Sequence, residues 1–102
     1  MKKVSTMVKE MKNKFEGISG IRDMSEWDDR KPNEAIHLGD VAEGGYIKVK
    51  IDGEWFEDPA ASYYGEFGRD DMYVNPKLED YLNKNGFIIE WYDAGTIYAY
   101  RD

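Results

Sequence analysis

Carboxylates are the side chains with which this sequence is best equipped for chemistry. Its 102 residues contain 21 aspartates and glutamates, no cysteine and one histidine, His37. Sequential pairs such as Asp28-Asp29 and Asp70-Asp71 point apart in an extended segment, and no spacing selects a general acid and base. His37 has no partner histidine and no obvious nucleophile, so we expect an ordinary surface or edge histidine rather than a catalyst. An enzyme is therefore the least favoured function.

Glycine-rich stretches are a second feature that often signals a ligand. Gly44-Gly45 and Gly65-Glu66-Phe67-Gly68 lack the strand-to-helix setting and the lysine of a phosphate-binding loop. No acidic spacing resembles a calcium-binding loop. We therefore predict no metal and no cofactor.

The connection formed by residues 58–74 is rich in tyrosine, glycine and carboxylates, and it is long for a compact domain. Tyrosine offers rigid contact area and glycine an adaptable backbone, as in binding loops. We therefore predict a partner-binding segment here. Its candidate contact residues are Tyr63, Tyr64, Glu66, Phe67, Asp70 and Asp71. In the alternative, residues 72–74 form a short strand and the aromatic side chains pack into the core.

Four further candidate contact residues lie on two predicted hairpins: Trp55, Glu90, Tyr98 and Tyr100. Alternation places Glu90, Tyr98 and Tyr100 on one amphipathic face of the C-terminal hairpin. Such a face suits either a partner surface or the underside of a helix. Trp55 is either a binding anchor or the solvated cross-strand partner of Lys50.

Two helices are predicted to position these hairpins. Apolar residues recur at helical spacing in residues 3–16, with lysines on the other side and Gly17 to end the helix. We expect this stripe to cover a sheet, the alternatives being a membrane-surface helix or a basic partner-binding helix. A short helix at 76–84 is marked by the cap Asn75, by Pro76 at its first position and by the terminating Gly86.

The C-terminal hairpin follows this helix at 87–101. A three-residue loop at 93–95 would place Tyr92 opposite Thr96 and Glu90 opposite Tyr98. The predicted core face carries Phe87, Ile89, Trp91, Ile97 and Ala99.

The other hairpin spans residues 46–57, where strict alternation leads into the preferred two-residue turn Asp52-Gly53. This turn pairs Ile51 with Glu54 and Lys50 with Trp55. The side chains predicted to face the core are Ile47, Val49, Ile51 and Phe56.

The segment before this hairpin is poorly periodic, except for a short predicted strand at 35–38. Trp27 stands among Glu26, Asp28 and Asp29. This cluster is either an acidic, aromatic-anchored contact patch or a tryptophan that plugs the edge of the core.

Charge is unevenly distributed along the chain. The formal net charge is −7, yet residues 1–14 carry five lysines against one glutamate, so the rest of the chain has a net charge of −11. Such a body repels nucleic acid and attracts basic surfaces. We therefore expect no direct nucleic-acid binding and a larger protein with a basic surface as partner. Because no apolar run approaches the length of a membrane span or signal peptide, we also expect a cytoplasmic protein without membrane association.

These observations predict a single α+β domain over residues 1–102. An N-terminal amphipathic helix packs on an antiparallel sheet made of the two hairpins, and a short second helix precedes the C-terminal hairpin. Three functions follow, in decreasing order of support. The first is a small acidic interaction module, in one form an inhibitor that docks on a basic, nucleic-acid-binding surface of a larger partner by charge mimicry. The second is a small-molecule-binding domain with a tyrosine-lined pocket between the sheet and residues 58–74, and the third is a small enzyme.

Overall fold

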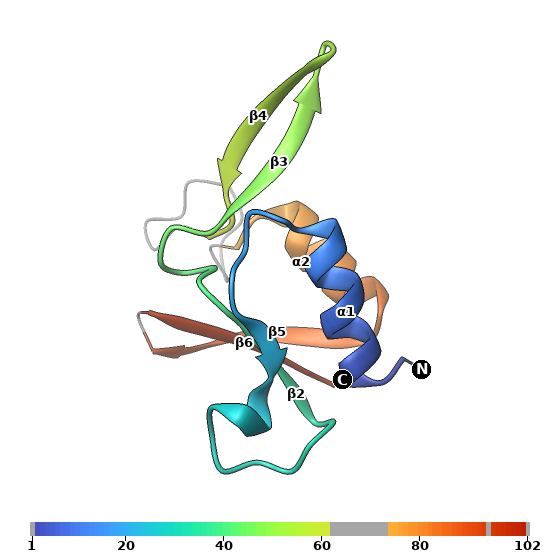
Figure 1. Cartoon of the computed structure of the whole chain (residues 1–102), viewed down its shortest axis with the longest axis vertical. Coiled ribbons are helices and arrows are strands. Elements are labelled where there is room, and N and C mark those ends of the chain that lie inside the picture. The colour runs from blue at the N-terminus through green and yellow to red at the C-terminus, as the bar shows by residue number, and fades with distance from the viewer. Residues whose placement is uncertain (1, 62–73, 94, 102) are drawn as a thin grey trace.

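The chain folds as an α+β protein in which two helices cover one side of an antiparallel sheet and a hairpin projects from the body (Figure 1). The computed structural model describes residues 2–61, 74–93 and 95–101, and of Val49 the backbone alone. Its elements in chain order are α1 (Val4–Lys14), β1 (Ile21–Asp23), the 3₁₀ turn η1 (Met24–Glu26), β2 (Ala35–Leu38), β3 (Tyr46–Ile51), β4 (Glu54–Pro59), α2 (Pro76–Lys84), β5 (Phe87–Asp93) and β6 (Thr96–Arg101).

Helix α1 buries its predicted apolar stripe against the sheet. Val4, Met7 and Met11 are fully buried, so the expectation that the stripe covers the sheet is confirmed. The helix ends at Lys14, before the predicted limit, because Phe15 leaves helical geometry and turns into the core.

The beginning of α1 is held by a residue from a distant loop. The Val4 N–H donates to Asn33 Oδ1 at 2.7 Å, and the Arg101 guanidinium donates to the same oxygen at 3.1 Å. The first N–H groups of a helix lack partners within the helix. The Asn33 side chain therefore caps α1, although it lies far from the helix in the sequence. Asn33 thereby joins the first helix to the last strand.

Helix α2 begins and ends as its sequence predicts. Asn75 Oδ1 accepts from the Lys77 N–H at 3.0 Å, Pro76 occupies the first turn, and Gly86 has a φ of +84°. Leu78 and Leu82 are fully buried.

The main sheet has the strand order β1-β2-β6-β5, with every neighbouring pair antiparallel. Figure 1 shows α1 and α2 on one side of this sheet and the segment 24–34 on the other. The predicted core residues of the C-terminal hairpin face the helices: Phe87, Ile89, Ile97 and Ala99 are buried, and Trp91 is partly buried.

The C-terminal turn differs from its prediction by one residue. Asp93, rather than Tyr92, pairs with Thr96, and a β-bulge lies between Trp91 and Asp93. The Asp93 carboxylate closes the turn by accepting from the Gly95 N–H at 2.9 Å. The extra residue of the bulge is Tyr92, whose side chain is therefore displaced outwards and is 47% exposed.

The hairpin β3–β4 corrects the prediction of a single sheet built from two hairpins, because it forms a two-stranded sheet of its own. The C-terminal hairpin pairs through β6 with β2 instead. The register of β3–β4 is the predicted one, with Ile51 opposite Glu54 and positive φ at Asp52 and Gly53. The prediction that one face of this hairpin packs into the core is correct for Ile47, which is buried near the start of β3. It is wrong nearer the turn, where Ile51 is 55% and Phe56 45% exposed.

The connection after β4 is described only at its ends. Ala61 and Val74 form an isolated antiparallel bridge, and Val74 is buried. The alternative strand at 72–74 otherwise lies outside the described residues. Among those residues, no helix is long and apolar enough to cross a membrane.

Candidate partner-binding face

The face of the main sheet that points away from the helices, here called the open face, carries a row of polar side chains across all strands. Strand register aligns Arg22 of β1 with His37 of β2, His37 with Tyr98 of β6, and Tyr98 with Glu90 of β5. These residues lie on the opposite side from the buried Ile21, Ile36 and Ala99, as alternation requires. Tyr100 extends the row on β6.

Glu90 is oriented by two tyrosine hydroxyls. Tyr98 donates to Glu90 Oε2 at 2.9 Å, and Tyr100 donates to Glu90 Oε1 at 3.0 Å. Partial burial, followed by the hydrogen bond to Glu90, raises the pKa of Tyr98 above its ordinary value. The Tyr98 hydroxyl therefore stays protonated at neutral pH, and the two hydrogen bonds keep the exposed carboxylate in one orientation.

An aromatic cluster adjoins this carboxylate. The Trp27 ring packs edge-on against Tyr92 with centroids 4.8 Å apart, and it tilts over His37 at 5.1 Å. Tyr92 contacts Tyr98 at 6.2 Å. Trp27 is 40% exposed, so it covers the open face and still presents much of its ring to solvent. Trp27 therefore shields His37, and its role in a contact patch stays a prediction.

Arg30 clamps the segment 24–34 onto the open face. Its guanidinium lies 4.8 Å from the Tyr98 ring centroid, and its Nε is 3.3 Å from Asp28 Oδ2. A hydrogen bond from the Asp29 N–H, then the contact with Arg30, lowers the pKa of Asp28.

Asp23 fixes the start of the same segment. Its carboxylate accepts from the Ser25 N–H at 2.9 Å and from the Asn33 N–H at 2.8 Å. Partial burial raises the pKa of Asp23, but these hydrogen bonds outweigh that effect and the pKa is lowered. The segment that carries Trp27 and Arg30 is thus anchored at both ends.

His37 corrects the expectation of a surface or edge histidine. It lies on an inner strand, is 5% exposed, and accepts from the Gly39 N–H at Nδ1 over 2.9 Å. Burial, and secondarily the charge of Arg22, lowers the pKa of His37. The imidazole is therefore neutral at physiological pH, and its role here is to support the Trp27 ring.

A shallow hollow of about 390 Å³ opens beside the Glu90 carboxylate. Its lining joins the open face to the segment 24–34 and the end of β6. The lining residues are Arg30, Asn33, Glu34, Glu90, Tyr98, Tyr100 and Arg101.

The predicted contact residues separate into three groups. Glu90, Tyr98 and Tyr100 come together as predicted. Trp55 lies apart from them on the projecting hairpin, where it is 66% exposed and Lys50 Nζ is 5.6 Å from its ring centroid. The other candidates lie outside the described residues; they are Tyr63, Tyr64, Glu66, Phe67, Asp70 and Asp71.

Tyr92 and Arg30 also belong to the open face, although neither is among the predicted contact residues. The exposure of Tyr92 depends on the bulge. Arg30 lies in an aperiodic segment, and no local signal places it over Tyr98.

In the part of the chain that the structure describes, no group of three or more histidine, aspartate or glutamate side chains is arranged to hold a metal ion. No family model matches the chain, and neither the curated proteins nor the solved structures contain a significant match to it.

Proposed function

We propose that this protein is a small acidic interaction module that docks its open face on a basic surface of a larger protein. The observation that carries the proposal is the Glu90 carboxylate, oriented by Tyr98 and Tyr100 beside an exposed aromatic cluster. Aromatic anchors and oriented charges are the features that concentrate binding energy in protein interfaces.

The negative net charge supports a basic surface on the partner protein. The chain has a net charge of −7, and carboxylates of the segment 24–34 adjoin the open face. A negative potential steers association with basic surfaces and disfavours direct contact with nucleic acid. The proposed mode of action is inhibition, in which carboxylates occupy the positions that phosphates would take on a nucleic-acid-binding surface.

The test begins with retention of a basic protein on the immobilised chain, followed by affinity measurements with that protein in purified form. Binding should weaken as salt rises, because exposed charges are screened over about 8–10 Å at ordinary ionic strength. Glu90→Gln keeps the size and the acceptor of the side chain while removing its charge, and it should weaken binding.

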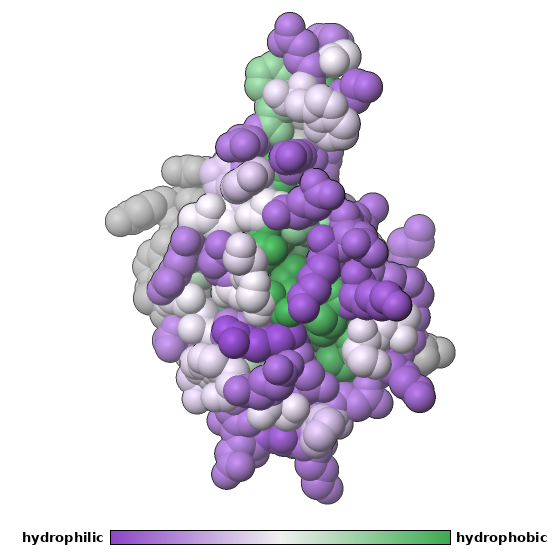
Figure 2. Space-filling view, in the orientation of Figure 1, coloured by the Kyte–Doolittle hydropathy of each residue, from purple (hydrophilic) through white to green (hydrophobic). Residues whose placement is uncertain are grey.

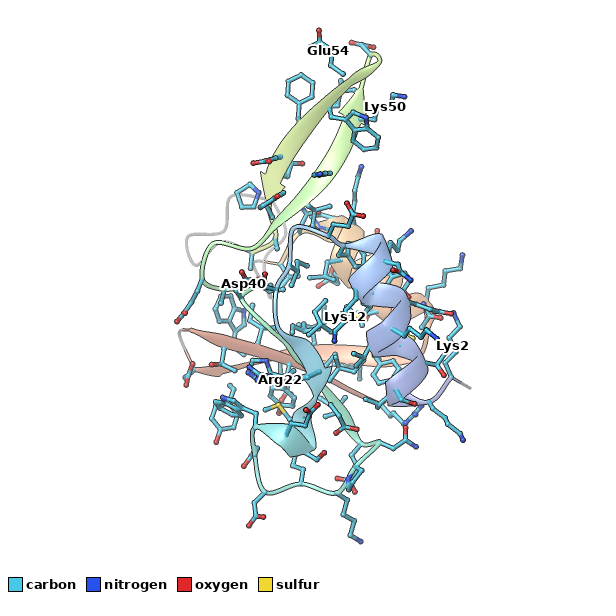
Figure 3. All side chains as sticks on the ribbon, in the orientation of Figure 1. Lys2, Lys12, Arg22, Asp40, Lys50 and Glu54 are labelled. Atoms are coloured by element: carbon cyan, nitrogen blue, oxygen red, sulfur yellow. The ribbon has the colours of Figure 1, made fainter. Side chains whose placement is uncertain are left out.

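Glu54→Gln is the matched control, because Glu54 lies at the far tip of the projecting hairpin (Figure 3) and the charge change is the same. Equal losses in the two variants would show that overall charge, not the open face, determines binding. Replacing Glu66, Asp70 and Asp71 by amides tests the predicted segment independently.

A second candidate function, small-molecule binding, is supported by the hollow beside Glu90. Its volume of about 390 Å³ and its lining of arginine, glutamate and tyrosine side chains suit a small polar ligand. A true ligand present at a hundredfold excess over its Kd would stabilise the fold by about 2.7 kcal/mol. A thermal-shift panel of metabolites and nucleotides measures this directly, and Arg30→Gln should abolish any stabilisation found.

A further inference from the structure

A second surface, on the opposite side of the molecule from the open face, has the reverse charge. A groove of about 500 Å³ lies between the end of α1, the root of β3 and α2. Four lysines and one aspartate line it, in a protein whose net charge is −7. The lining residues are Lys14, Phe15, Ile47, Lys48, Lys77, Asp80, Tyr81 and Lys84.

The floor of this basic groove is an aromatic pair. Phe15 and Tyr81 meet edge to face with centroids 5.3 Å apart, and Lys14 Nζ lies 5.5 Å from the Tyr81 centroid. The Tyr81 hydroxyl donates to Glu10 at 3.2 Å, and burial, followed by the charge of Glu10, raises its pKa to about 12. The aromatic floor is therefore held in place by Glu10, and the Lys14 ammonium group lies above it.

The lysines retain capacity for an anionic ligand. Lys48 Nζ approaches Glu16 only to 4.0 Å. No ion pair is found for Lys77 or Lys84 among the described residues. Since these side chains come from β3 and from both ends of α2, the positive charge is spread along the groove rather than concentrated at one point.

The free edge of β3 leads into this groove. Around a two-residue turn, Ile51 and Glu54 exchange backbone hydrogen bonds, so the N–H and C=O groups of Lys48 and Lys50 point away from β4. Tyr46 confirms this direction, because its N–H donates outwards to the Gly17 carbonyl at 3.1 Å. Within the described residues, no backbone partner is found for the outward groups of Lys48 and Lys50.

The two edges of the hairpin are not equivalent. On β4 the outward positions are Trp55, Glu57 and Pro59, and Pro59 has no N–H to donate. Glu57 would also repel an acidic chain. On β3 the outward positions carry lysines, and the other side of the strand carries Ile47 and the half-exposed Ile51. Figure 2 shows hydrophobic surface on this projecting hairpin.

We infer that β3 accepts an extended acidic segment of a partner protein as a third strand, whose end enters the basic groove. The added strand alternates acidic and apolar residues: the acidic ones face Lys48 and Lys50, and the apolar ones cover Ile51. Strand addition supplies backbone hydrogen bonds, while the alternate side chains supply specificity. It also completes a two-stranded sheet, which is marginal on its own.

The test uses a fluorescent, end-capped heptapeptide of alternating glutamate and valine, titrated with the full chain and followed by anisotropy. The expected result is saturable binding. A heptapeptide with lysine in place of glutamate, and one with the same residues in two blocks, should not bind. Reversal of both Lys48 and Lys50 to glutamate should weaken binding about tenfold or more, because two ion pairs become repulsive contacts.

Alternate N-methylation of the peptide separates strand addition from attraction by charge alone. In a β-strand the N–H groups of successive residues point to opposite edges, so every second N–H faces the same edge. Methylation of one alternate set should therefore abolish binding, and methylation of the other set should leave it intact. Equal binding of both methylated peptides would overturn the inference, as would unchanged affinity in the doubly reversed variant.

A second copy of this chain is the competing occupant. Sedimentation of the protein without peptide distinguishes it: the inference requires a monomer at the concentrations of the titration. Self-association that is lost when Lys48 and Lys50 are reversed would assign the edge to a second copy and overturn the proposal. Circular dichroism of the variant, whose substituted side chains are exposed or edge-facing, verifies that the fold persists.

Discussion

The two hairpins of this protein have similar sequence patterns and different surroundings. β5–β6 buries one face under the helices, and Ile97 and Ala99 have no exposed surface. β3–β4 alternates just as regularly, yet Ile51 and Phe56 are about half exposed. Alternation therefore determines which side chains share a face, whereas neighbouring elements determine whether that face becomes core.

The difference begins at the strand edges. β6 pairs on one side with β5 and on the other with β2, so its backbone groups are satisfied within the sheet. Among the described strands, β3 and β4 pair only with each other. A stable central sheet and a hairpin with a usable edge are thus combined in one small chain.

Amide hydrogen exchange should show the largest contrast between these regions. The amides of β6 should exchange only through global unfolding, and those shared by β3 and β4 through local opening. Protection factors should differ on the order of a thousandfold or more. Similar protection of both hairpins would mean that β3–β4 is stabilised as strongly as the central sheet.

Matched isoleucine substitutions should show the next largest contrast. Ile97→Ala removes a fully buried side chain and should destabilise the fold by about 2–5 kcal/mol. Ile51→Ala changes a 55% exposed side chain and should cost about 1 kcal/mol or less. Urea unfolding measures both, and a large loss for Ile51→Ala would contradict the exposed position of the hairpin.

Asn75 connects the two regions, and its loss should have an intermediate effect. Its Oδ1 caps α2, and its Nδ2 donates to the Pro59 carbonyl at the end of β4 over 3.0 Å. Asn75→Ala removes both bonds and should cost about 1–2 kcal/mol. Asn75→Asp keeps the cap but not the donor, so any stability that it recovers in urea unfolding belongs to the cap.

His37 should give the smallest effect, visible in the pH dependence of stability. Its pKa is lowered in the folded state, so the unfolded state binds more protons as pH falls through about 6.5. The wild-type chain should thus be less stable at pH 5 than at pH 7, with the loss ending below the folded pKa. His37→Gln should flatten this dependence in unfolding curves.

Asp23 and Asp28 should affect stability in a lower pH range than His37 does. Asp23 and Asp28 have lowered pKa values, so their contribution is present above their ordinary range near 4 and is lost as pH falls below it. If stability changes with pH between pH 7 and pH 5 in His37→Gln as it does in the wild-type chain, groups other than His37 cause that change.

Local signals explain what the sequence predicts well. The cap, proline and glycine of α2 lie within or beside the helix that they define, and Asp52-Gly53 determines the register of β3–β4 without help from other elements. The shared face of Glu90, Tyr98 and Tyr100 follows from alternation within one hairpin.

Contacts between distant segments explain what it does not predict. β1 has only three residues, and its pairing with β2 becomes recognisable only in the folded sheet. The packing of Trp27 on His37 and Tyr92 and the position of Arg30 over Tyr98 join segments far apart in the chain. The bulge at Tyr92 accompanies the hydrogen bond from the Gly95 N–H to the Asp93 carboxylate, which the hydrophobic pattern does not reveal.

Asn33 holds Val4 and Arg101 to one side-chain oxygen, which brings the two ends of the described chain together (Figure 1). Adjacent ends make a fold suitable for circular permutation. A short linker between the ends, with new termini at the exposed Asp52-Gly53 turn, would preserve every connection in the main sheet. β3 and β4 would then become the two terminal strands of the rearranged chain, each available for fusion to a reporter.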